Sequence, residues 1–224
     1  MPFTVAISKN RIPIRKNIWI KIFIAVFLIV WADSLIGTTD LANWLLENAL
    51  TIIFLFFLLW SYKRYQFSDL SFLLICLFLC IHVYGSKHSY AENPFGFWLQ
   101  DKFNWERNHY DRIVHFFFGF LLAYPMREFF LKWLRFPRWA AWALPIEITL
   151  SIGSLYELIE WGVADIFFPE QGMAYLGTQG DVWDAQKDIF LAVLGAVIAT
   201  TLLSLIKKIG NIYSAEELAA MKEK

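Results

Sequence analysis

Residues 108–116 read Asn-His-Tyr-Asp-Arg-Ile-Val-His-Phe and open an apolar run that continues to Leu131. Asp111 and His115 are four residues apart, so on a helix their side chains share one face. An ionisable group inside the hydrocarbon layer costs about 2.5–3.5 kcal/mol on insertion scales, so its presence there indicates a polar site. The stretch predicts a membrane helix with buried polar groups at one end.

The composition of the 224-residue chain is that of a membrane protein, with 58% hydrophobic and 19% aromatic residues. Soluble domains are nearer about 45–50% apolar. The formal net charge of +0 gives no electrostatic basis for binding nucleic acid. Cys76 and Cys80 lie in one apolar run, four residues apart, and we expect free thiols there rather than a disulfide.

Six apolar runs have about the length that a membrane-spanning helix needs, which is roughly 17–25 residues. They cover residues 18–36, 41–60, 70–85, 112–131, 139–168 and 188–206. No small-residue cleavage site follows the first run, so we expect no cleavable signal peptide. We predict an all-α, polytopic membrane helix bundle that forms a single transmembrane domain over residues 1–224.

The distribution of basic residues predicts the orientation of these spans. Fifteen of the 20 Lys and Arg residues belong to the termini and to the second–third and fourth–fifth connections, counting Lys21 and Arg127 near the adjoining ends of their spans. The other connections hold Lys87, Lys102, Arg107, Arg112 and Lys187. The positive-inside rule therefore places both termini in the cytoplasm.

This orientation brings ionisable groups from four separate segments to the outer leaflet. They are His82, His88, His109, Asp111, His115, Glu157, Glu160, Asp181, Asp184 and Asp188. A polar stripe at helical spacing runs along the fifth span through Glu147, Ser151, Ser154 and Glu157. Small residues in the sixth span allow a neighbouring helix to approach closely, at Ala192, Gly195 and Ala199. We expect the polar faces to meet inside the bundle.

Carboxylates and imidazoles at membrane depth have two chemical uses. Together they are normal ligands for Zn²⁺, Mn²⁺ or Fe²⁺. The candidate metal ligands are His88, His109, His115, Glu157, Asp184 and Asp188. The same groups can perform metal-free acid–base chemistry, for which the candidate catalytic residues are His115, Asp111, Glu157 and Glu160. No His-Glu-x-x-His signature is present, so both uses stay open.

Each group also has a structural interpretation. Asp111 and His115 can form a hydrogen-bonded pair within one helix. The two glutamates of the fifth span can pair with Arg107, Arg112 or Lys187, and the aspartates of the sixth can cap their helix. The convergence of four segments favours a functional site over these interpretations.

The connection at residues 86–111 alternates aromatic and polar residues. Its aromatic side chains are favoured at the membrane–water interface, so the pattern indicates a short amphipathic segment in the outer interface. Such a segment serves either as an anchor or as a lid over a substrate in the outer leaflet.

Four segments carry a resemblance to a known family: His88–Tyr90, Asn108–Phe116, Glu157–Trp161 and Gly177–Asp188. They resemble the YjdF-like bacterial inner-membrane proteins, and the resemblance covers most of the chain. It implies a multi-pass protein of the bacterial inner membrane.

A looser similarity is to VanZ-like membrane proteins, which are associated with glycopeptide-antibiotic tolerance at the cell envelope. It rests on Asp111-Arg112-x-x-His115-Phe116, on a glutamate late in the next span and on the acidic start of the last span. The chain departs from that pattern by two extra N-terminal spans and by Asp-x-x-Asp-Ala-Gln-Lys-Asp in place of Asp-x-x-x-Asn. The similarity therefore implies architecture.

Three functions are compatible with these features. The first is an enzyme, a metal-assisted hydrolase or transferase acting on a lipid or an envelope precursor. The second is a non-catalytic envelope factor, and the third is a proton-coupled transporter. A transporter needs a polar path toward the cytoplasm, where Glu147 is the main candidate, and no inverted repeat is visible. The implied partners are the lipid bilayer, a lipid or precursor substrate and a divalent metal ion.

Overall fold

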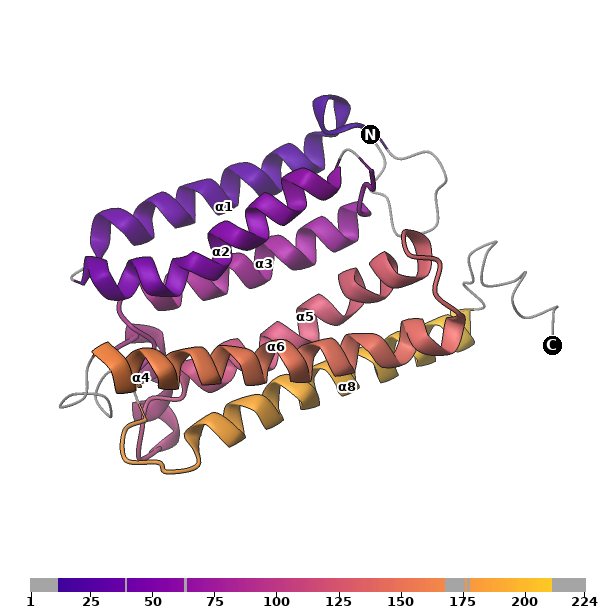
Figure 1. Ribbon diagram of the computed structural model, residues 1–224. Helices are drawn as coiled ribbons and strands as arrows, with labels where there is room; N and C mark the ends of the chain where they lie inside the picture. The colour runs from indigo at the N-terminus through magenta and orange to yellow at the C-terminus, as the bar shows by residue number, and fades with distance from the viewer. Residues whose placement is uncertain (1–11, 39, 63, 168–175, 177, 211–224) are drawn as a thin grey trace.

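A computed structural model describes residues 12–38, 40–62, 64–167, 176 and 178–210. Within these residues the chain forms seven α-helices and a short 3-10 turn at Ile14–Lys16, with no strand (Figure 1). The helices are α1 (Ile18–Gly37), α2 (Leu41–Tyr62), α3 (Asp69–Ser86), α4 (Pro94–Phe103), α5 (Tyr110–Lys132), α6 (Arg138–Phe167) and α8 (Asp184–Gly210). The sequence also predicts a short polar helix in the tail after Lys208, capped by Ser214, and this tail beyond Gly210 lies outside the described residues.

Five of these helices, α1, α2, α3, α5 and α8, are long and apolar enough to cross a membrane. The 30-residue helix α6 packs along α5 and α8 but is not among these five, so a sixth span at residues 139–168 stays a prediction. The structure confirms the predicted all-α, multi-pass membrane bundle.

The spans form two groups that meet through α3 and α5. Helices α1, α2 and α3 lie together, and α5, α6 and α8 form the second group (Figure 1). The main apolar core lies where α1, α3 and α5 meet, and its buried members include Phe27, Ile75, Leu79, Val83 and Leu122. Cys76 and Cys80 on α3 are free thiols, as expected.

Small residues bring α5 and α8 into backbone contact, as their spacing predicted. A Cβ atom added at Gly119 would overlap the carbonyl oxygen of Ala192, and one added at Gly195 would overlap that of Phe116. Ala196 is fully buried in the same contact. This close approach sets the acidic start of α8 directly against the start of α5.

At the opposite end of α5, buried polar contacts hold the first group of helices in place. Asn17 caps α1, and its side-chain amide donates a hydrogen bond of 2.6 Å to Asp69 on α3. Glu128 on α5 accepts a hydrogen bond of 2.7 Å from the hydroxyl of Ser68, the residue that caps α3. These contacts fix the position of α3 relative to α5, and therefore the space between them.

Candidate functional site

Two arginines join the start of α5 to the start of α8. Arg107 donates two hydrogen bonds to the carboxylate of Asp184, of 2.6 and 3.2 Å, and one of 2.8 Å to the carbonyl of Thr178. Arg112 donates to Asp181 at 2.5 Å and to Asp184 at 2.9 Å. Arg107 and Asp184 are only 8% and 5% exposed, so this is a buried ion pair of the bidentate type.

The three cations nearest the site are Arg107, Arg112 and Lys187. They pair with Asp181 and Asp184, just before and at the start of α8, and not with the glutamates of α6. Lys187 completes the set with a hydrogen bond of 2.6 Å to Asp181. Lys187, the backbone N–H of Trp183 and Arg112 hold the pKa of Asp181 well below its usual range. The glutamate pairing that the sequence left open is thus not the one observed.

His115 lies between two carboxylates on different helices. Its Nε2 is 3.6 Å from Oδ1 of Asp111, one turn away on α5, and 3.4 Å from Oε1 of Glu157 on α6. The ring is buried, and Tyr156 contacts it edge-on with centroids 6.0 Å apart. The structure brings together three of the four predicted catalytic residues.

The fourth, Glu160, lies one turn beyond Glu157 and interacts with Tyr156 and Glu47. Tyr156 donates a hydrogen bond of 2.8 Å to the carboxylate of Glu47 on α2. Neither Glu47 nor Tyr156 was predicted from the sequence as a site residue. A signal for Glu47 was available, because it is an isolated acid within the apolar run at residues 41–60.

His82 is held by hydrogen bonds on both ring nitrogens. Its Nδ1 lies 2.6 Å from the Tyr90 hydroxyl, and its Nε2 lies 3.1 Å from the carbonyl oxygen of Glu47. Since a carbonyl only accepts, we assign the proton to Nε2, and Tyr90 donates to Nδ1. Burial raises the pKa of Tyr90 well above its usual value, which keeps this donor neutral. His82 is a buried, fully paired histidine.

Two predicted metal ligands stand apart from this arrangement. The ring of His88 contacts Tyr84 edge-on, and Nδ1 of His109 lies 3.2 Å from Arg112. Burial, reinforced by Arg112, lowers the pKa of His109. Neither histidine belongs to a cluster of metal-binding type among the described residues.

Three carboxylates form such a cluster within the described residues. Oxygen atoms of Asp111, Asp184 and Asp188 lie within 4.8 Å of one another. Two of them were predicted as metal ligands, whereas Asp111 was predicted as a catalytic residue. His115 and Glu157 adjoin this trio through Asp111.

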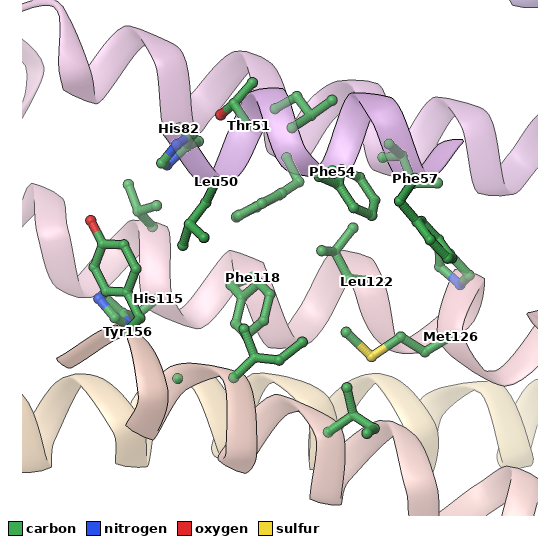
Figure 2. A pocket seen from close by; sticks show the side chains of 18 of the residues that line it. Leu50, Thr51, Phe54, Phe57, His82, His115, Phe118, Leu122, Met126 and Tyr156 are labelled. Atoms are coloured by element: carbon green, nitrogen blue, oxygen red, sulfur yellow. The ribbon is translucent and has the colours of Figure 1, made fainter. Parts of the chain in front are cut away.

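A cavity of about 520 Å³ begins at Asp111 and His115 and extends between α2, α3, α5 and α6. Most of its wall is apolar, with Phe57 and Met126 toward one end (Figure 2). The polar side chains lie at the other end, where the figure shows His82, His115 and Tyr156 close together. Tyr90 and Asp111 also line the cavity, and so does Thr51, whose buried hydroxyl has no hydrogen-bond partner.

Two parts of the sequence interpretation need correction. Glu147 and Ser151 are exposed on α6, so the half of the expected polar stripe nearer the start of this helix does not face the bundle. The buried face of this part of α6 instead carries Ala141, Pro145 and Thr149. Helix α4 exposes Phe97 and Trp98 but contributes no residue to the cavity wall, which favours the anchor over the lid.

Comparisons with known proteins place this arrangement in a family. The family model described as "Predicted membrane protein (DUF2238)" matches residues 19–209. The inner membrane protein YjdF of Escherichia coli (strain K12) is 36% identical over 171 residues, which cover 75% of this chain and 81% of the relative. No solved structure matches the chain.

Proposed function

The chain belongs to the DUF2238 family of multi-pass membrane proteins, and we propose that it is an enzyme acting on a lipid bound in its cavity. One observation carries the proposal. His115 lines the polar end of an apolar cavity and lies between the carboxylates of Asp111 and Glu157. An apolar pocket that ends in a few converging polar groups is the usual form of a ligand site.

The cavity suits a molecule with an apolar chain that enters from the bilayer. Its volume of about 520 Å³ lies within the range of ligand sites, roughly 300–1,000 Å³. Ile53 on α2 and Ile152 on α6 line it and are 62% and 42% exposed, and exposed faces of membrane spans contact lipid. An acyl or isoprenoid chain therefore reaches the cavity without crossing water.

The polar end supports hydrolysis or group transfer at the head of such a lipid. In this reaction Nε2 of His115 takes a proton from water or an acceptor hydroxyl, whose oxygen bonds to the electrophilic centre. The bond to the leaving oxygen breaks, and the proton that His115 took passes through the carboxylate of Glu157 to that oxygen. Asp111, whose Oδ1 lies 3.6 Å from the same Nε2, would stabilise the imidazolium that forms when this nitrogen takes the proton.

We place this chemistry at the outer leaflet. The support is the excess of Lys and Arg in the termini and in the two connections that follow α2 and α5. The site residues lie at the other ends of these helices, on the side of α4 (Figure 1). The substrate class that fits is a membrane lipid or a lipid-linked envelope precursor.

The test compares lipid extracts of cells that make the wild-type protein, His115→Ala or a matched control, His88→Ala. We expect one lipid class to be depleted, with a product in its place, for the wild type and the control but not for His115→Ala. Purified protein in vesicles of total bacterial lipid should repeat the conversion. Glu157→Gln should lose the conversion while keeping its membrane yield, because glutamine has nearly the size and shape of glutamate.

Native mass spectrometry of the same proteins separates enzyme from non-catalytic factor. A lipid retained equally by the wild type and by His115→Ala, with no conversion by either, would assign the cavity to binding alone. Such a result would favour the envelope-factor alternative, and the enzymatic proposal would be wrong.

A further inference from the structure

The trio of Asp111, Asp184 and Asp188 brings three carboxylates together from two helices. Asp184 and Asp188 occupy successive turns of α8, and Asp111 faces them from the first turn of α5. One oxygen of each lies within 4.8 Å of the others. Deeper along the same two helices, Gly119 and Gly195 bring the backbones of α5 and α8 into contact. This contact fixes the distance between the helices, and therefore between the three carboxylates.

Asp188 gives the independent sign that the trio faces a ligand. Its side chain is 2% exposed, yet Oδ1 has no hydrogen-bond partner. The nearest cationic atom is Nε of Arg112 at 4.0 Å, beyond hydrogen-bond range. Buried polar atoms are nearly always paired, because an unpaired one costs about 1–3 kcal/mol, and more if it is charged.

Around the trio there are more carboxylates than cationic side chains. The cations that face the trio are Arg107, Arg112 and Lys187, and each bonds Asp181 or Asp184. The carboxylates are Asp111, Asp181, Asp184, Asp188 and, beside His115, Glu157. With all five carboxylates ionised, they would outnumber these fixed cations by two, and one divalent cation would balance that excess.

We propose that Asp111, Asp184 and Asp188 bind one hard divalent cation of the Mg²⁺, Mn²⁺ or Ca²⁺ class. All three donors are carboxylate oxygens, the ligand type that these ions prefer over zinc or copper. Asp184 can bind while still accepting from both arginines, because a carboxylate has about four acceptor positions. The donor set therefore replaces the histidine-rich site that the sequence suggested.

Asp111 belongs to both the trio and the cavity wall, so the ion would lie at the polar end of the cavity. There it can contact the head of a bound molecule directly, as ions of this class do with phosphate groups. The cation site does not rest on the proposed enzymatic activity. Binding of the ion is measured without any lipid conversion, so the two proposals can fail separately.

Mn²⁺ is the probe, followed by electron paramagnetic resonance of the free ion during titration of the chelator-treated, detergent-purified full chain. We expect one saturable Mn²⁺ per chain, displaced by excess Mg²⁺ or Ca²⁺. Asp188→Asn should weaken binding at least about tenfold, the lower bound seen when metal-site partners are removed. The control is Asp33→Asn, an exposed aspartate paired with Lys87 away from the trio.

Thermal unfolding of the same samples gives a second measurement. Mn²⁺ should raise the melting temperature of the wild type and of Asp33→Asn, but not that of Asp188→Asn. If Asp188→Asn does not fold, the less buried Asp111→Asn serves in its place. The absence of saturable Mn²⁺ binding by the wild type would overturn the proposal, and so would equal affinity in the wild type and either folded trio variant.

Discussion

The hydroxyl of Tyr156 donates a hydrogen bond of 2.8 Å to Oε2 of Glu47, and this bond ties α6 to α2 beside the polar end of the cavity. We predict that Tyr156→Phe lowers the free energy of unfolding by about 1–3 kcal/mol, because a half-buried carboxylate loses its donor. Tyr62→Phe is the control, because the Tyr62 hydroxyl accepts a hydrogen bond of 3.0 Å from the backbone N–H of Ile14 at the far end of α2, away from Glu47. Equal melting temperatures for Tyr156→Phe and the wild type would contradict the prediction.

The ion pairs of the α8 segment differ in burial, and we expect their energies to differ accordingly. Arg107→Ala should cost free energy of unfolding near the lower end of roughly 3–5 kcal/mol, because Asp184 stays buried but keeps Arg112. Lys187→Ala removes a pair whose lysine is half-exposed, and should cost under about 1 kcal/mol. Chemical unfolding in detergent measures both. A larger loss for Lys187→Ala than for Arg107→Ala would refute the assignment of the buried pair.

The contact between α5 and α8 predicts contrasting effects of two glycine substitutions. Gly195→Ala places a methyl group against the backbone of Phe116, so α8 must shift, at a cost of about 1–3 kcal/mol in unfolding free energy. Gly162→Ala adds the same methyl group where nothing lies within 4 Å, and should be neutral or stabilising. Melting temperatures of the two variants check this. Similar values would argue against close packing at Gly195.

The ring of His88 predicts a pH dependence of stability. Burial, reinforced by the charge of Lys87, lowers the pKa of His88 below its ordinary value of 6.5. The folded state therefore binds this proton less readily than the unfolded state. The contribution of His88 is fully present above about pH 6.5 and is lost as the pH falls through the folded-state pKa. Between about pH 7.5 and pH 5, the melting temperature should fall further for the wild type than for His88→Gln. Parallel curves would show that His88 does not contribute.

The orientation of the spans predicts the outcome of reporter fusions. Fusions after residues 66 and 135 should report the cytoplasm, and fusions near residues 100 and 175 should report the outside, because of the bias of basic residues. The two pairs control each other, since opposite signals are expected from the same chain. A cytoplasmic signal near residue 100 would move the polar site to the inner leaflet.

The helices could be predicted from the sequence because each apolar run is long and is bounded by polar residues. Asn17, Ser68 and Asn93, whose side chains cap α1, α3 and α4, mark three of the starts. The small residues at Ala192, Gly195 and Ala199 also predicted that a neighbouring helix could approach α8 closely, without identifying it as α5. These features depend on local sequence alone.

The pairing of side chains across helices was less predictable, because it depends on the rotation and depth of each helix. Helical spacing placed Asp111 beside His115, and depth in the membrane placed Glu157 near them, but neither predicted the hydrogen bond from Tyr156 to Glu47. Nor did either show that Arg107 binds an aspartate 77 positions away. Spacing describes one helix face at a time, whereas a site between helices needs the relative positions of several.

The carboxylates of α6 have a consequence for the synthesis of this protein in the membrane. Helix α6 carries Glu147, Glu157 and Glu160 and is less apolar than the five helices that meet the hydropathy of a membrane span. Each such group at a helix centre adds about 2.5–3.5 kcal/mol to transfer from the translocon into lipid, and the groups that face Glu157 belong to α5. We therefore expect α6 to leave the translocon together with α5, with α8 joining as it emerges. The site would then be assembled during insertion, by a group of helices rather than by single helices in turn.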